Sequence, residues 1–239
     1  MKDYISNREL EELGNGLVAS FFEWAGWIEA PKCVDIIGVA GFLGLDVVFE
    51  HFAEEEPDKI GFLSDGRTPL KIRRNGRVVS FLFPLGTIVL DAVLRTDAEI
   101  GRCRFTIAHE IAHHVICRHN PAPQFHQIYD TERDYSPEEM KRHLSAEEAQ
   151  ADRLAAVILM PEKTVMQALL DYHGGIPVTV YGDNVIHGDD KKAIRQMAAC
   201  MGVSYTALLI RLKELKLLDY RPLSEYVDTT LRGGALPWV

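Results

Sequence analysis

Two histidines lie four residues apart inside a segment that is expected to form a helix. This helix is predicted to begin near Asp97, because Thr96-Asp-Ala-Glu99 has the pattern of a capping box, and to run to about Arg118. Asn120-Pro121 then ends it. Residues four apart share one face of a helix, so the two imidazoles of His109-Glu110-Ile111-Ala112-His113 point the same way.

Two neutral imidazoles at this spacing can bind one Zn²⁺. Glu110, directly after the first histidine, can reach a water at the metal and take a proton from it. Catalytic zinc needs a third protein ligand and one open position. The pattern therefore predicts His109 and His113 as metal ligands. A third ligand is then expected elsewhere in the chain.

The third ligand is predicted on a second helix, which continues as Arg153–Met160 and ends before Pro161. Glu148 and Asp152 share a face of this helix, where like charges repel by roughly a few tenths of a kcal/mol unless a cation or a histidine lies nearby. Glu148 can complete a two-histidine, one-glutamate site, and Asp152 can accept the other N–H of a ligand histidine. An alternative stays open, because Ser145-Ala-Glu-Glu148 is also a capping-box pattern and one carboxylate cannot serve both purposes.

The two segments together resemble a known family. Arg104-Phe-Thr-Ile-Ala-His-Glu-Ile-Ala-His113 and Glu148-x-x-Ala-Asp-x-x-Ala-Ala-x-x-Leu-Met-Pro161 are similar to the two signatures of the ImmA/IrrE family of zinc metallopeptidases. The similarity extends over roughly residues 60–218. It implies a gluzincin-like α+β core in which helices carry the metal and a small twisted sheet flanks the cleft.

The resemblance also implies a role for each site residue. His109, His113 and Glu148 would be the zinc ligands, Glu110 the catalytic base, and Asp152 the carboxylate behind a ligand histidine. It further implies a specific protein substrate, a helix-turn-helix transcriptional repressor, which such an endopeptidase would cut. The residue that stabilises the oxyanion is left open among several histidines and tyrosines: His119, His126, His143, His173, His187, Tyr129 and Tyr172.

Sheet signals precede the histidine motif. Strands are predicted at Asp46–Glu50 and Gly86–Asp91, and Asn75-Gly76 between two β-forming runs predicts a type I′ hairpin. We expect Thr87–Asp91 to pair with an extended substrate by β-addition. Upstream, Leu17, Phe21, Trp24 and Ile28 recur at helical spacing, and Val34–Leu45 repeats that rhythm.

After Pro161, the sequence predicts a helical section. Two helices between Asp189 and Leu215, joined at Gly202 and with Ser204 as the second N-cap, have the outline of a helix-turn-helix. We therefore expect a zinc peptidase domain over residues 1–172, and over residues 173–239 a helix-turn-helix-like section and tail that pack on the same domain. The alternative function is a DNA-binding or protein-binding regulator with a structural or vestigial zinc site, or a catalytically silent zinc module.

Composition narrows the classes of protein. The formal net charge of −9 argues against a chain that coats nucleic acid or an anionic membrane, so direct DNA binding is not expected. No uncharged segment reaches the roughly 20 residues of a spanning helix, and no membrane partner is predicted. The amino terminus has no apolar signal core, and the four cysteines show no pairing pattern, which together predict a cytoplasmic protein.

Overall fold

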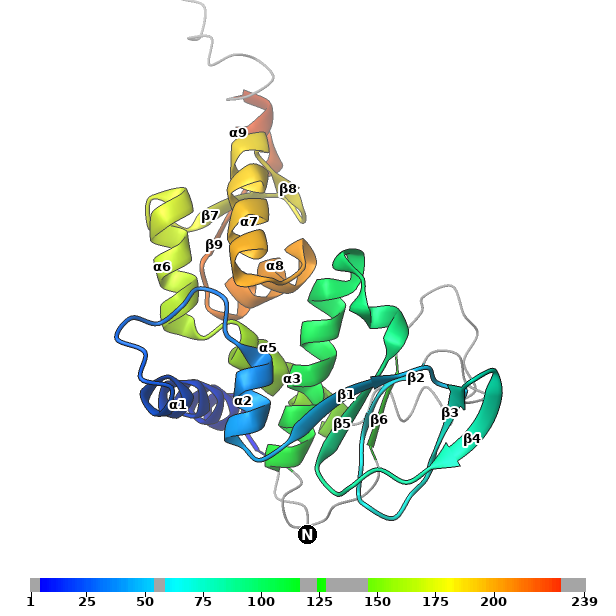
Figure 1. Ribbon diagram of the computed structural model, residues 1–239. Coiled ribbons are helices and arrows are strands. Elements are labelled where there is room, and N and C mark those ends of the chain that lie inside the picture. Colours follow the sequence, from blue (N-terminus) through cyan, green and yellow to red (C-terminus); the bar gives the residue numbers. More distant parts are fainter. Residues whose placement is uncertain (1–4, 54–58, 117–123, 128–145, 229–239) are drawn as a thin grey trace, which may run out of the picture. The chain divides into compact units, whose positions relative to one another are not determined.

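The computed structural model describes residues 5–53, 59–116, 124–127 and 146–228. The chain forms two compact units, Met1–Pro161 and Glu162–Val239. Both combine helices with small sheets, so the predicted α+β class is confirmed (Figure 1). The boundary between the units follows Pro161, whereas the predicted boundary follows Tyr172; that the two pack as one domain stays a prediction.

The first unit contains a four-stranded sheet with the order β1-β5-β2-β6. β1 is parallel to β5, and β2 is antiparallel to both of its neighbours. The predicted strands at Asp46–Glu50 and Gly86–Asp91 are confirmed as β1 and β5. The bounds of the four strands are β1 Asp46–Glu50, β2 Lys59–Leu63, β5 Thr87–Asp91 and β6 Gln124–Gln127.

Four helices complete the layer structure of this unit: α1 Asn7–Trp24, α2 Ile36–Phe42, α3 Ile100–Ile116 and α5 Ala146–Leu159. α3 lies against β2, β5 and β6 on one side and against α5 on another, and α1 packs on α5. A capping box begins α1, because Ser6 Oγ accepts from the Glu9 amide and the Glu9 carboxylate accepts from the Ser6 amide. The core of the unit therefore forms around α3 and α5.

Two local expectations in this unit are wrong. α1 ends at Trp24, and Ile28 is fully exposed, so it does not continue the apolar stripe of that helix. The capping box does not form: the Thr96 side chain makes no capping hydrogen bond, and the Glu99 carboxylate pairs with Arg102 at 2.8 Å. The segment before α3 forms two 3₁₀ turns, η1 Ala92–Arg95 and η2 Asp97–Glu99.

The hairpin is confirmed as strands β3 Leu70–Arg74 and β4 Arg77–Phe81. Asn75 and Gly76 have φ values of 51° and 74°, the positive angles that a type I′ turn requires. Glycine and asparagine are the residues that adopt this conformation at least cost. One face of the hairpin joins the apolar cluster of Phe62, Leu70, Ile72, Phe83 and Val89.

The second unit contains the predicted pair of helices, α7 Gly188–Met201 and α8 Tyr205–Glu214. Gly202 ends α7 in the left-handed region at φ 64°, and Ser204 Oγ accepts from the Ala207 amide at the start of α8. The unit also has a sheet of order β8-β7-β9, which we did not predict. Its remaining elements are α6 Glu162–His173, β7 Val178–Tyr181, β8 Val185–Ile186, β9 Leu218–Arg221 and α9 Leu223–Tyr226.

We predict that Gly14→Ala destabilises the first unit and that Gly16→Ala does not. A Cβ at Gly14 would lie 2.5 Å from Val157 Cγ1, where α1 approaches α5, whereas a Cβ at Gly16 meets no atom within 4 Å. Alanine should stabilise an open helical position by up to about 1 kcal/mol, while overpacking typically costs about 1–3 kcal/mol. Urea unfolding of both variants measures the difference, and equal stabilisation by both would contradict this packing.

Candidate metal centre

α3 carries both histidines of the motif into the interior of the first unit. The His109 and His113 side chains are 1% and 2% exposed, and their rings meet edge to face with centroids 4.6 Å apart. Their Nε2 atoms are 2.9 Å apart. The helical spacing thus brings two nitrogen donors to one point inside the protein.

Glu148 approaches the same point from α5. Its Oε2 lies 3.2 Å from His109 Nε2, and its Oε1 lies 3.4 Å from His113 Nε2. Packing fixes this approach, because the inner face of α5 is buried through Leu154, Ala155 and Ile158 while α3 lies against it. Ser145, the other end of the alternative capping box, lies outside the described residues.

The three side chains fit a divalent cation. Their ligand atoms all lie within 4.8 Å of one another. Two atoms bound to tetrahedral zinc at about 2.0–2.2 Å would be about 3.3–3.6 Å apart, close to the spacing in this cluster. Two imidazole nitrogens and one carboxylate oxygen are also a donor set that zinc accepts. The residues present can therefore hold the metal.

Asp152 fixes the orientation of one histidine. Its Oδ1 accepts a hydrogen bond from His109 Nδ1 at 2.8 Å. With the proton held on Nδ1, the neutral ring directs the lone pair of Nε2 toward Glu148 and His113. For His113, Nδ1 is buried and no described residue forms a hydrogen bond with it. The sequence offered no signal for a hydrogen-bond partner of His113 Nδ1.

Without a metal ion, the electrostatics of the cluster favour a protonated His109. Burial opposes a charged His109 ring, but hydrogen bonds to Asp152 and Glu148 outweigh it and raise the pKa of His109 to about 9. Burial would raise the pKa of Glu148, yet the hydrogen bonds from His109 and His113 bring that pKa well below its usual value. Glu110 is completely buried, and its charge also helps to raise the pKa of His109.

The candidates that the sequence left open for the oxyanion fall in several parts of the chain. His119, His143 and Tyr129 lie outside the described residues. His126 lies on β6, and Tyr172, His173 and His187 belong to the second unit. His173 has its own partners, the Ile176 carbonyl and Asp190.

The prediction that Thr87–Asp91 pairs with an extended substrate is wrong. β5 pairs with β1 on one side and with β2 on the other, so its backbone groups are already hydrogen-bonded in both directions. A central strand of a sheet cannot accept an added strand. The outer strands of the described sheet are β1 and β6.

We predict that zinc affinity rises with pH and levels off near 9. Zinc binds the neutral imidazole, so below its pKa of about 9 His109 must release a proton, and affinity should rise about tenfold per pH unit. The stability of the metal-free protein should depend on pH in the opposite sense. Because the pKa of His109 is raised on folding, the protonated ring stabilises the fold below pH 6.5, and this contribution is lost as pH rises through about 9. Competition with a chromophoric chelator and melting of the metal-free protein measure the two effects.

Asp152→Asn is the matched variant for this prediction. It removes the negative charge that helps to raise the pKa of His109, while the amide oxygen can still accept from Nδ1, so the affinity should level off at a lower pH. An affinity that does not change with pH in either protein would contradict the assignment of His109 as a ligand.

Comparison with known proteins agrees with the geometry. Residues 93–213, which include α3 and α5, match the family described as the IrrE N-terminal-like domain (Peptidase_M78). No curated protein matches the chain significantly. Within the described residues, no single helix is long and apolar enough to cross a membrane, although α7 and α8 pass that test together as a bent pair. The chain belongs to the peptidase family of the IrrE N-terminal-like domain.

Proposed function

We propose that this peptidase is a zinc-dependent endopeptidase that cuts a specific protein substrate in the cytoplasm. One observation carries the proposal: His109, His113 and Glu148 direct their ligand atoms to one point, and a buried glutamate follows the first histidine. Membership of the peptidase family supports hydrolysis of a peptide bond. The donor set of two imidazoles and one carboxylate favours zinc.

Zinc held by these three residues would supply a Lewis acid that polarises the substrate carbonyl and lowers the pKa of water to about 7. Asp152 keeps the Nδ1 proton of His109, so that Nε2 remains available as a donor. Burial of both histidines excludes bulk water from one side of the cluster and strengthens electrostatic interactions there.

Glu110 is the general base in this proposal. Its carboxylate takes a proton from the attacking water and then returns that proton to the leaving amine. Glu110 is completely buried and directly follows His109 on α3. The Glu148 carboxylate contacts both histidines, so Glu110 is the carboxylate that remains for the proton transfer.

The proposed substrate is a helix-turn-helix repressor. The family resemblance implies this class of substrate, and the net charge of −9 is compatible with a basic DNA-binding protein. Cleavage would remove the repressor from its operator and release the genes it controls.

A regulator that binds DNA directly is the alternative, and the helix pair favours it by geometry. α7 and α8 are bent by 101° relative to one another, within the range of helix-turn-helix motifs. The side chains argue against it. Arg211, one of the two basic residues of α8, is 1% exposed and lies 3.6 Å from Glu214, so it cannot reach a phosphate or a base. Lys213 remains as the one exposed basic residue on α8.

We predict that Glu110→Gln abolishes proteolysis and leaves zinc binding and melting temperature nearly unchanged. Glutamine keeps the size of the side chain but cannot accept the proton, and loss of a general base typically costs about 10²–10⁴-fold in rate. His113→Ala should lose activity, zinc and the stability that zinc provides. Labelling of new protein N-termini in cells that produce each variant measures the activity even while the substrate is unidentified.

The matched control is Glu147→Gln, one residue from the ligand Glu148 and absent from the metal cluster. It should yield the same new N-termini as the unmodified chain. The same N-termini in cells with Glu110→Gln would rule out the proposed mechanism. N-termini that depend on Glu110 but lie in no DNA-binding protein would reject the repressor as substrate and keep the peptidase.

A further inference from the structure

The hairpin of β3 and β4 leaves one strand edge without a partner among the described residues. β3 is occupied on both sides: β4 pairs with it along one edge, and on the other the Ala53 amide donates to the Lys71 carbonyl and the Arg73 amide to the His51 carbonyl. β4 pairs only with β3 in the part of the chain that the structure describes. Its outer edge is therefore available to another strand.

The register identifies the backbone groups on this edge. A two-residue loop makes the flanking residues, Arg74 and Arg77, a hydrogen-bonded pair. Hydrogen-bonded and non-hydrogen-bonded pairs alternate along an antiparallel ladder. The amides and carbonyls of Val78 and Ser80 consequently point away from β3, in the spacing that an added strand needs.

Apolar side chains lie on β4 and on the segment that follows it. Val78 and Leu82 are each 53% exposed, and Leu85 is 69% exposed. A cavity of about 490 Å³ follows the end of β4 and is lined by Asp65, Gly66, Arg67, Leu82, Phe83, Pro84 and Leu85. The buried Ser64 hydroxyl donates to the Phe83 carbonyl and holds one wall in place. The cavity can receive an apolar side chain from a strand that pairs with β4.

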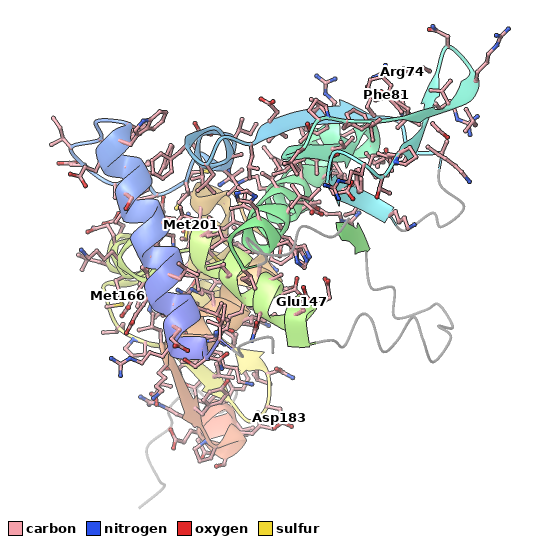
Figure 2. The ribbon with its side chains drawn as sticks, turned by 90° about the horizontal axis from the view of Figure 1, so that it is seen from below. Arg74, Phe81, Glu147, Met166, Asp183 and Met201 are labelled. Carbon is pink, nitrogen blue, oxygen red and sulfur yellow. The ribbon has the colours of Figure 1, made fainter. Side chains whose placement is uncertain are left out.

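The charge of the hairpin is opposite to that of the whole chain. Arg74 is engaged with Glu50 and lies over the Phe81 ring, 4.3 Å from its centroid (Figure 2). Arg73 and Arg77 are exposed, and neither forms an ion pair with a described residue. Because strands are spaced by about 4.8 Å, Arg77 would adjoin an added strand and could meet a glutamate on the same face. Arg73, which pairs with Val78, lies on the opposite face of the hairpin and would stand about 10 Å from the added strand.

We propose that the edge of β4 binds an extended acidic segment of a partner protein by strand addition, with an apolar side chain of that segment in the adjoining cavity. The exposed backbone groups require a polypeptide strand, and the two arginines favour carboxylates on it. A second copy of this hairpin is disfavoured, because pairing of two β4 edges would bring both sets of arginines together. The hairpin lies outside residues 93–213, and this inference does not depend on the peptidase activity.

Fluorescence anisotropy with the full chain at low salt tests the proposal. The probe is a dye-labelled ten-residue peptide that alternates valine with glutamate and ends in leucine. Two matched peptides carry lysine in place of glutamate, or N-methyl groups on alternate amides so that the backbone cannot pair. We expect the glutamate peptide to bind at least about tenfold more tightly than either matched peptide.

Variants separate charge from backbone pairing. Arg73→Glu combined with Arg77→Glu should reverse the preference toward the lysine peptide. Ser80→Pro should abolish binding and preserve the hairpin, because the lost amide points outward. Arg8→Glu, a reversal of an exposed arginine on α1, should have no effect. Circular dichroism checks that each variant is folded.

Three outcomes would overturn the proposal. Equal binding of the N-methylated and glutamate peptides would mean attraction by charge alone. Dimerisation that Ser80→Pro abolishes would assign the edge to a second copy. Binding that appears only after the acidic residues among Glu54-Glu-Glu-Pro-Asp58 are replaced by serine would assign the edge to this chain's own segment.

Discussion

The site depends on the packing of α3 against α5, which buries two imidazoles beside a carboxylate. Buried polar and charged groups are costly unless each has a partner. Here the carboxylate of Glu148 lies 3.2 Å and 3.4 Å from the two Nε2 atoms, and those nitrogens are 2.9 Å apart. Such a cluster needs a positive charge at its centre, either a proton or a cation. The high pKa of His109 is the result in the metal-free protein.

Local sequence signals predicted the parts of this arrangement that a single element determines. Helical spacing predicted that His109 and His113 share one face, and the same spacing relates Glu148 to Asp152 on α5. Repulsion between those two carboxylates indicated a histidine nearby, and Asp152 does contact His109. The Asn-Gly pair predicted the hairpin because positive φ angles at two successive positions suit few residues.

Features that depend on distant partners were not predictable in this way. The sequence predicted β5 as a strand, but its pairing with β1 and β2 is set by the whole sheet. The short strands of the second unit carry too few residues for a periodic signal. Arg211 is basic in the sequence, yet it is buried against Glu214, and its position leaves Lys213 as the one exposed basic residue of α8.

The zinc content of purified Glu148→Ala tests the central claim most directly, with Glu147→Ala as its neighbour on the same helix (Figure 2). Elemental analysis should find about one zinc per chain in the unmodified protein and in Glu147→Ala, and little in Glu148→Ala. Full zinc occupancy in Glu148→Ala, accompanied by fraying at the start of α5, would contradict the claim. That result would make Glu148 a helix cap and place the third ligand elsewhere.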